Sequence, residues 1–252
     1  MTMTGGGTGG MDGGTGPGAG RSAELAANLA AVRHRIAAAC AAAGRTPAEV
    51  VLITVTKTFP AADVRLLAGL GLSEFGESRD AEARAKAAEL AGLPIRWHFV
   101  GQVQTNKAGS VARYADVVHS VDRPELVTAL DRGAAAHRDR PLDVLLQVSL
   151  DSAPAAGRGG ADPAAVPALA DRVEAAKHLG LAGLMAVAPL GADPGPAFAR
   201  LAELAAALRA DHPAATVLSA GMSGDLEAAV RHGATHVRVG TALLGGRSGL
   251  VR

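Results

Sequence analysis

Residues 50–60 read VVLITVTKTFP, and the fold can be predicted by asking how often this pattern returns along the chain. Residues 50–56 form an unbroken apolar and β-branched run, which is typical of a strand buried on both faces in a parallel sheet. Lys57 follows the run directly, and a helical stretch begins a few residues later. A strand followed by a helix is the unit from which α/β domains are built. The stretch also raises a second question, because it places an ammonium group at the exit of a buried strand.

The same strand-then-helix unit occurs eight times. The predicted strands are residues 50–56, 74–76, 97–100, 117–121, 144–150, 184–187, 216–219 and 236–239. The predicted Ala-rich helices between them are residues 61–69, 79–90, 106–114, 124–137, 163–179, 196–210 and 224–232. Eight such units favour a closed (β/α)8 TIM-type barrel. No Gly-x-Gly-x-x-Gly motif follows the first strand, which weighs against an open dinucleotide-binding sheet.

The region before the first strand divides into two parts. Residues 1–20 are mostly Gly and Thr, and such a segment cannot bury enough apolar surface to offset its ordering entropy. Ser22 can cap a helix that carries apolar residues at helical spacing and ends near Gly44. We therefore expect a disordered tail over residues 1–20 and one barrel domain over residues 21–252. Residues 151–162 are the most loop-like internal segment and are predicted to be mobile.

Composition limits the classes of protein to which the chain can belong. Of its 252 residues, 48% are apolar and 2% aromatic, which suffices for a core of Leu, Val, Ile and Ala. The 25 basic and 24 acidic residues give a net charge of +1, so neither nucleic acid nor a membrane surface is an expected partner. The single cysteine, Cys40, excludes an internal disulfide and a Cys-based metal cluster, and no metal site is predicted. Without a signal peptide or a run of about 18 apolar residues, we expect a soluble, cytoplasmic protein.

Glycine and hydroxyl residues cluster after the seventh and eighth predicted strands. Barrels of this kind carry their sites at the C-terminal ends of the strands and often hold a phosphate between these two loops. Ser223 or Gly224 is expected to begin a helix whose free N–H groups face an anion. The alternative is that Ser223 is only an N-cap and Gly240 only a turn. The other residues of the predicted site in these loops are Ser219, Gly221, Met222 and Thr241.

Lys57 gains a possible role from this phosphate site. An amine at the end of an apolar strand is expected to be partly desolvated, which favours the neutral form that attacks an aldehyde. The pattern therefore suggests a phosphorylated aldehyde as ligand. The alternative is a lysine whose stem follows the apolar surface while its ammonium reaches water.

Several motifs in a fixed order resemble a known family. They are Val-Thr-Lys-Thr with Pro60, Phe75-Gly76-Glu77, Trp97-His98-Phe99-Val100-Gly101, Gln104-Thr105-Asn106-Lys107, Gly183-Leu184-Met185, Gly221-Met222-Ser223-Gly224-Asp225 and Val237-Arg238-Val239-Gly240-Thr241. From Ser22 to Gly246 the chain resembles the pyridoxal phosphate homeostasis proteins. These are single barrels of fold type III, related to the N-terminal domain of bacterial alanine racemase.

The resemblance implies that the chain binds pyridoxal 5'-phosphate (PLP). It implies that Lys57 forms a Schiff base with PLP and that Ser223, Gly240 and Thr241 hold the phosphate. Arg238 is implied to lie close to the cofactor, at the pyridine nitrogen or at the phosphate. An arginine near the nitrogen would disfavour its protonation and weaken the ring as an electron sink.

The rim of the implied site both matches the family and departs from it. Asn106 and Lys107 match an Asn-Lys pair of the family, and Lys107 is either a second amine near PLP or a solvated residue on the first helical turn. Ser78 stands where the family usually has Asn, which makes a polar contact from this position shorter or absent. The other departures are Arg79 in place of Tyr, Ser149 in place of Asn, and Gly157-Arg158-Gly159-Gly160 near a usual Lys-x-Gly element.

Two catalytic alternatives compete with a role as a carrier. Racemisation needs a second acid–base group, a tyrosine supplied by a second domain and a partner subunit, whereas this chain has one tyrosine, Tyr114. A Schiff-base aldolase acting on a phosphorylated sugar would need an acid–base partner for Lys57, and Glu77 is the obvious strand-end carboxylate. The resemblance implies instead a protein that buffers PLP and delivers it to PLP-dependent apo-enzymes. We expect it to be a monomer without catalytic activity of its own.

Overall fold

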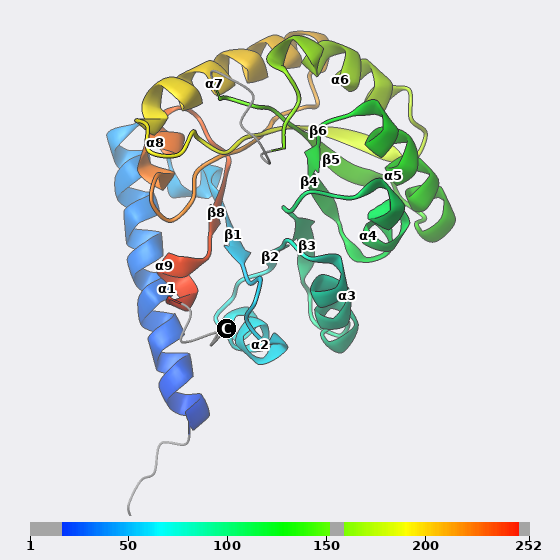
Figure 1. The fold of residues 1–252 in the computed structure, drawn as a ribbon. Helices are drawn as coiled ribbons and strands as arrows, with labels where there is room; N and C mark the ends of the chain where they lie inside the picture. Colours follow the sequence, from blue (N-terminus) through cyan, green and yellow to red (C-terminus); the bar gives the residue numbers. More distant parts are fainter. Residues whose placement is uncertain (1–16, 152–158, 247–252) are drawn as a thin grey trace, which may run out of the picture.

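The computed structural model describes residues 17–151 and 159–246, which form a closed barrel of parallel strands surrounded by helices (Figure 1). The strands are β1 (Val51–Val55), β2 (Glu74–Glu77), β3 (Arg96–Phe99), β4 (Val117–Val121), β5 (Leu142–Gln147), β6 (Leu179–Met185), β7 (Val217–Ser219) and β8 (His236–Val239). Their order around the barrel is their order in the chain, and β8 closes the barrel by pairing with β1. The predicted (β/α)8 barrel is confirmed.

The helices follow the strands as predicted, with small differences in their bounds. They are α1 (Pro17–Ala42), α2 (Ala61–Gly69), α3 (Asp80–Glu89), α4 (Ala108–Tyr114), α5 (Pro124–His137), α6 (Val166–Glu174), α7 (Pro194–Asp211), α8 (Leu226–Arg231) and α9 (Thr241–Leu244). Short 3-10 turns are η1 (Pro47–Glu49), η2 (Thr105–Lys107) and η3 (Pro163–Ala165). Within the described ranges, no helix is both long and apolar enough to cross a membrane.

Helix α1 begins five residues earlier than predicted. It already includes Ser22 at its start, so Ser22 does not cap it. Residues 1–16 of the predicted tail lie outside the described residues, as do residues 152–158 of the segment predicted to be mobile. The apolar face of α1 packs against α8 and α9 (Figure 1). Cys40 is fully buried in this packing, among the apolar side chains of the cluster.

Strand β6 is where the prediction was wrong. Residues 163–179 were expected to be one helix and residues 184–187 the strand, whereas β6 already starts at Leu179. Two glycines break the apolar run of this strand and weaken the sequence signal for it. Gly183 has φ of +149°, and a Cβ atom there would lie 1.9 Å from the carbonyl oxygen of Val217 in β7. A glycine is therefore required for the close approach of β6 and β7.

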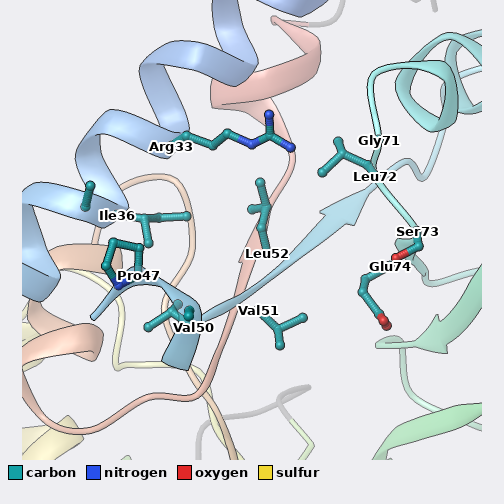
Figure 2. A pocket seen from close by; sticks show the side chains of 12 residues that line it. Arg33, Ile36, Pro47, Val50, Val51, Leu52, Gly71, Leu72, Ser73 and Glu74 are labelled. Atoms are coloured by element: carbon teal, nitrogen blue, oxygen red, sulfur yellow. The ribbon is translucent and has the colours of Figure 1, made fainter. Parts of the chain in front are cut away.

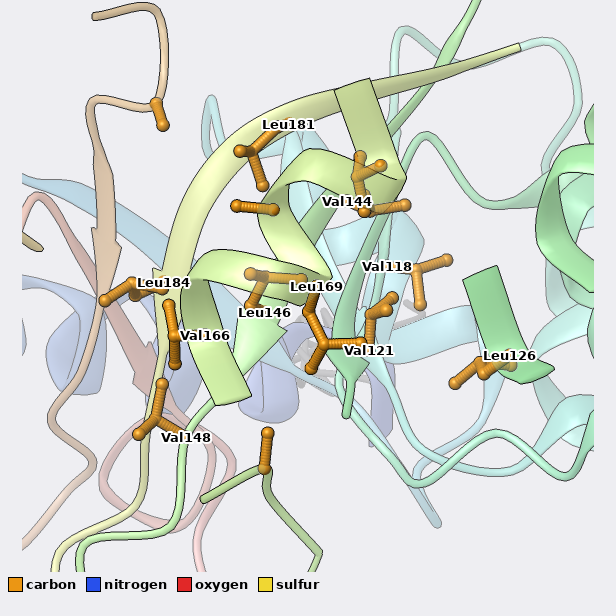
Figure 3. Close-up of a cluster of buried hydrophobic side chains, with 14 of the residues drawn as sticks. Val118, Val121, Leu126, Val144, Leu146, Val148, Val166, Leu169, Leu181 and Leu184 are labelled. Carbon is orange, nitrogen blue, oxygen red and sulfur yellow. The ribbon is translucent and has the colours of Figure 1, made fainter. Parts of the chain in front are cut away.

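Apolar side chains fill the layer between the barrel and its helices. The larger cluster lies around β4, β5 and β6, under α4 to α7, and Figure 3 shows part of it, including Val118, Leu146 and Leu184 from the strands and Leu169 from α6. A second cluster joins α1 and α2 to β1, β2 and β8. This continuous outer core fixes the strands against their helices, so the barrel can tolerate polar residues in its interior.

The interior of the barrel is divided into an apolar and a polar half. A small separate cluster of Val117, Leu145 and Met185 lies on the side of β4, β5 and β6. Buried polar side chains from β3, β4, β7 and β8 occupy the rest of the interior; they are His98, His119, Ser219 and Arg238. An interior of this type departs from the branched apolar layers usual in such barrels.

Candidate functional site

Lys57 lies in the turn after β1, at the C-terminal rim of the barrel. Its side chain is exposed, so the expected partial desolvation is not present in the structure. In the described part of the chain, its amine has no hydrogen-bond or ion-pair partner. The amine is therefore free to meet a ligand at the rim.

The turn that carries Lys57 is anchored on both sides by a buried polar cluster. Lys86 of α3 donates 2.7 Å hydrogen bonds to the Thr56 carbonyl oxygen, to Glu77 and to Glu82. The Thr56 hydroxyl donates to the same Glu77 carboxylate at 2.6 Å. The Thr58 backbone N–H donates to Glu82 at 2.5 Å. Both neighbours of Lys57 are thereby held to α3.

Thr58 has a φ of +70°, in the left-handed region, and it is the only non-glycine residue with positive φ in the described ranges. A β-branched residue reaches this conformation only when its surroundings enforce it. The bond from its N–H to Glu82 supplies that constraint. The conformation turns the chain directly after Lys57.

The loop after β7 is shaped by tight backbone contacts. Gly221 has φ of +88°, and a Cβ atom there would lie 2.6 Å from the Ala229 Cβ atom. The Met222 N–H donates to Asp225 Oδ1 at 2.6 Å. The hydroxyl of Ser223 accepts a 3.3 Å bond from the Ala242 N–H of α9. The last contact joins the loops after β7 and β8, as expected for a shared anion site.

The helix after β7 starts later than predicted. Its first residue is Leu226 and its N-cap is Asp225, so neither Ser223 nor Gly224 begins it. Helices α8 and α9 are short, and the long helix dipole invoked for this loop is absent. What the loops do offer is free donors: in the described residues, the backbone N–H groups of Ser223, Gly224 and Thr241 donate no hydrogen bond.

Gly240 brings the exit of β8 against the exit of β1. A Cβ atom at Gly240 would lie 3.2 Å from the Val55 carbonyl oxygen. Because Lys57 is two residues beyond Val55, the amine and the free N–H groups of Thr241 and Ser223 lie on neighbouring segments of one rim. Gly240 therefore supports the predicted site by allowing this close approach.

Ser219 and Arg238 lie below this rim, inside the barrel. Ser219 is fully buried, and its hydroxyl accepts a 2.8 Å bond from the Arg238 Nη1–H. Arg238 also donates to the Ala186 carbonyl oxygen at 2.8 Å. Ser219 is thus engaged with Arg238 and, through a 3.1 Å contact, with His119. This differs from the free hydroxyl at the phosphate that the sequence predicted.

Burial sets the protonation of these interior groups. It lowers the pKa of Arg238 to about 10, which still leaves a guanidinium at neutral pH. Burial lowers the pKa of His119 well below its usual value, and the nearby His98 and Arg238 lower it further. Burial also lowers the pKa of His236 to about 4. The interior therefore carries the Arg238 guanidinium beside the neutral imidazoles of His119 and His236.

The remaining candidate residues, Ser78, Asn106 and Lys107, lie in the loops after β2 and β3. Ser78 and Lys107 line a cavity of about 450 Å³ between β2, β3, α3 and α4. Asn106 is exposed in η2 and does not line this cavity. A second cavity of about 380 Å³ lies at the exits of β5 and β6 and includes Ser149 and Gly159. The structure thus brings Lys57 together with the loops after β7 and β8, but leaves Asn106 without a contact that would define its role.

Sequence reasoning missed the groups that support these residues. Lys86 and Glu82 lie within the predicted Ala-rich helix of residues 79–90, and their direction toward the turn after β1 follows only from the fold. His119 occurs inside a predicted strand without a motif, and His98, although part of a family motif, was given no role. A signal did exist, because a histidine in an otherwise apolar strand needs a hydrogen-bond partner when it is buried.

Comparison with known proteins first identifies the class of protein that this chain resembles. A family model described as "Alanine racemase, N-terminal domain" matches residues 27–248. A protein of unknown function from Bifidobacterium adolescentis has the same fold, with a TM-score of 0.83, 31% identity and coverage of 89% of this chain and 96% of that one.

Relatives with higher identity define the family more closely. The pyridoxal phosphate homeostasis protein of Mycobacterium tuberculosis is 49% identical over 234 residues, which cover 86% of this chain and 90% of that protein. A structure of PipY from Synechococcus elongatus with PLP bound has a TM-score of 0.74 and 38% identity, covering 88% of this chain and all of that one. The chain belongs to the pyridoxal phosphate homeostasis protein family.

Proposed function

We propose that this protein binds PLP at the C-terminal mouth of the barrel and acts in PLP homeostasis by buffering and delivering the cofactor. The observation that carries the proposal is the meeting of three features at one rim. Lys57 has a free amine, the loops after β7 and β8 have free N–H donors, and β8 lies directly beside β1. Family membership and the PLP-bound structure of PipY support the choice of ligand.

The loops after β7 and β8 suit a phosphate. Backbone N–H groups and hydroxyls recognise phosphate oxygens without needing a lysine or arginine at the contact. Ser223, Gly224 and Thr241 present such N–H groups, and Gly240 leaves the approach open. The Ser223 hydroxyl already joins the two loops and can accept from Ala242 while donating to a ligand. Met222, which is 37% exposed, lies beside these donors.

Lys57 supplies the nucleophile. PLP, when bound, supplies an aldehyde that condenses with an amine and releases one water. Anchoring of Thr56 and Thr58 to α3 fixes the backbone on both sides of Lys57 while leaving its side chain free. This arrangement limits the positions that the Lys57 amine can reach, and the amine stays exposed to solvent.

Arg238 faces the interior of the barrel instead of the phosphate loops. Its two bonds, to Ser219 and to the Ala186 carbonyl oxygen, direct the guanidinium across the axis toward β6 and β7. We infer that Arg238 lies at the pyridine ring of the cofactor and not at its phosphate. A guanidinium there would keep the ring nitrogen unprotonated and suppress carbanion chemistry, which suits a carrier better than a catalyst.

The catalytic alternatives find little support in the described residues. Tyr114 is half-buried, its hydroxyl is buried without a partner, and burial raises its pKa, so it is poorly suited to exchange protons at the mouth. Glu77 is buried and bonded to Lys86 and Thr56 in the layer beside α3, and it is not a free base for an aldolase. A carrier role with PLP-dependent apo-enzymes as recipients, in a monomeric cytoplasmic protein, remains our expectation.

A titration with PLP tests the proposal. The chain has four lysines, so borohydride reduction followed by peptide mapping can assign the attachment site. We expect a visible absorption band and the label on Lys57, and loss of both in Lys57→Ala. Lys177→Ala is the matched control, because Lys177 is exposed just before β6, at the far end of the barrel. A label on Lys107 or an unchanged Lys57→Ala spectrum would contradict the assignment. Transfer of PLP to an apo-enzyme, compared with amino-acid racemisation, separates carrier from catalyst.

A further inference from the structure

A chain of hydrogen bonds crosses the interior of the barrel from one end to the other. Glu74 Oε2 lies 2.5 Å from His98 Nε2, and His98 Nδ1 lies 2.8 Å from His119 Nε2. His119 Nδ1 lies 3.1 Å from the Ser219 hydroxyl, which accepts from Arg238 at 2.8 Å. His119 belongs to β4 and Ser219 to β7, and these strands are not neighbours in the barrel. The contact between them must therefore cross the interior.

The direction of each bond in this chain follows from its two ends. Arg238 can only donate, so its Nη1–H points to Ser219. At the other end Glu74 is an acceptor, because the contact with His98 lowers the pKa of this carboxyl against the effect of its burial. If both imidazoles are neutral, each carries its proton on Nε2 and accepts through Nδ1. The Ser219 hydroxyl then donates to His119, and every member has a partner.

The reversed arrangement leaves a buried group unsatisfied. If His98 carried two protons, it would donate to His119, and His119 would donate to Ser219. Ser219 would then accept from two donors, and no acceptor for its own proton is present among the described residues. A buried donor without a partner is strongly disfavoured, because it loses its hydrogen bond to water and gains none in the protein. The ordered chain that runs from Arg238 to Glu74 is therefore the favoured one.

Glu74 is the member of the chain that meets solvent. Its side chain is 24% exposed, whereas that of His98 is 1% exposed. It lines a cavity of about 550 Å³ at the N-terminal end of the barrel, between α1, η1, β1 and β2. Figure 2 shows Arg33 from α1, Leu52 from β1, and Ser73 and Glu74 at the start of β2 around this cavity. This chain of hydrogen bonds thus joins the partly exposed Glu74 carboxylate at one end of the barrel to Arg238 near the other end.

We propose that Glu74, His98 and His119 are positioning residues that hold the Arg238 guanidinium in place through Ser219. The Ala186 carbonyl oxygen alone would leave the planar group free to turn about one contact, and the second bond to Ser219 fixes its plane. Ser219 can act as that acceptor only while its own proton is taken by His119. Each imidazole in turn keeps its tautomer because the next member accepts from it. The part of this proposal that concerns cofactor binding rests on the proposed function.

The arrangement is not a metal centre. In the described ranges no group of three or more His, Cys, Asp or Glu side chains is placed to hold a metal ion. The His236 ring lies tilted against that of His98, with ring centroids 6.4 Å apart, but His236 bonds to Thr235 and lies outside the chain of hydrogen bonds. The pairing of both His98 nitrogens, with Glu74 and His119, leaves none for a ligand.

Nitrogen-15 NMR of the imidazoles tests the chain in the protein without cofactor. We expect both His98 and His119 as the tautomer protonated on Nε2 only, with Nε2 protons that exchange slowly. In Glu74→Leu we expect a mixture of tautomers at His119 and side-chain N–H exchange at Arg238 at least about tenfold faster, because the chain loses its terminal acceptor. Glu74→Gln retains an acceptor and should restore most of the wild-type signals. A cationic His98, or His119 protonated on Nδ1, would overturn the proposal.

A PLP titration monitored by absorbance then tests the consequence for the cofactor. We expect Glu74→Leu and Ser219→Ala each to weaken PLP binding about tenfold. Asp143→Asn is the matched control, because Asp143 pairs with Arg96 at the same end of the barrel but does not belong to the chain of hydrogen bonds. It should bind PLP as the wild type does. If Arg238 exchange and PLP affinity are unchanged in both test variants, the positioning role is refuted. If the wild type itself fails to bind PLP, the proposed function fails, while the tautomers still decide whether the chain exists.

Discussion

Two lysines lie near the exit of β1, and their surroundings are opposite. Lys57 is exposed and its amine has no partner in the described residues, whereas Lys86 is 6% exposed and donates to three acceptors. Both side chains are joined to the same short turn, one covalently and one through the Thr56 carbonyl oxygen. The difference separates two roles: the Lys86 amine holds the backbone of the turn, and the Lys57 amine remains available to a ligand.

The largest expected effect is the loss of the anchoring amine. Lys86→Met leaves the buried carboxylate of Glu77 without its cation, and breaking a buried pair in this way costs about 3–5 kcal/mol. Urea unfolding followed by circular dichroism should show this decrease in the free energy of unfolding. The double variant Lys86→Met with Glu77→Gln is the control, and it should recover a large part of the loss. A decrease below about 1 kcal/mol in the single variant would mean that Lys86 is not an anchor.

The stability of the same variant should depend on pH more strongly than that of the wild type. Burial raises the pKa of Glu77 even with Lys86 present, and removal of the ammonium should raise it further. A carboxyl whose pKa is higher in the folded state binds more protons there, so the free energy of unfolding falls as pH rises from the unfolded to the folded pKa. The deficit of Lys86→Met should therefore be smaller at pH 5 than at pH 8. Equal deficits at the two pH values would contradict a protonated Glu77 in the variant.

The two lysines also show which features of the fold and the candidate site could be predicted from the sequence. Seven of the eight strands were predictable because apolar runs such as residues 50–56 stand between clear helical stretches. The position of Lys57 and of the loops after β7 and β8 on one rim was predictable because strand ends in a barrel share that rim. Strand β6 was not predictable, because its glycines weaken the apolar pattern. Gly183 is required only by the close approach of β6 to β7, where an added Cβ atom would lie 1.9 Å from the Val217 carbonyl oxygen.

The supporting residues could not be predicted for a related reason. Lys86 and Glu82 sit on an Ala-rich helix, where charges usually face solvent, and only the packed position of α3 turns them toward Thr56 and Thr58. The partnership of His119 with Ser219 joins residues 100 apart in sequence on strands that are not neighbours. Contacts across a barrel depend on the register and tilt of all its strands, and no local pattern encodes them.

A smaller effect is expected at the turn between the two lysines. Thr58 has positive φ, which costs a β-branched residue about 1–2 kcal/mol, whereas Asn tolerates this region better. Thr58→Asn should therefore raise the free energy of unfolding by about 0.5–1 kcal/mol, since the backbone N–H bond to Glu82 is retained. The same change at Thr105, an exposed residue without positive φ, is the control and should have no such benefit. Destabilisation by Thr58→Asn would show that the threonine side chain itself contributes to the turn.

The smallest effect on stability is expected at Lys57, the lysine that we propose to bind PLP. Lys57→Ala removes an exposed side chain with no partner among the described residues, and surface changes of this kind usually shift stability by less than about 0.5 kcal/mol. Urea midpoints of the variant and the wild type should agree, while borohydride should no longer attach PLP to this position. Lys86→Met provides the opposite pattern, with low stability but with Lys57 still present to react in the folded fraction. A large loss of stability in Lys57→Ala would mean that its amine contributes to the fold, and the division between an anchoring and a free lysine would then be wrong.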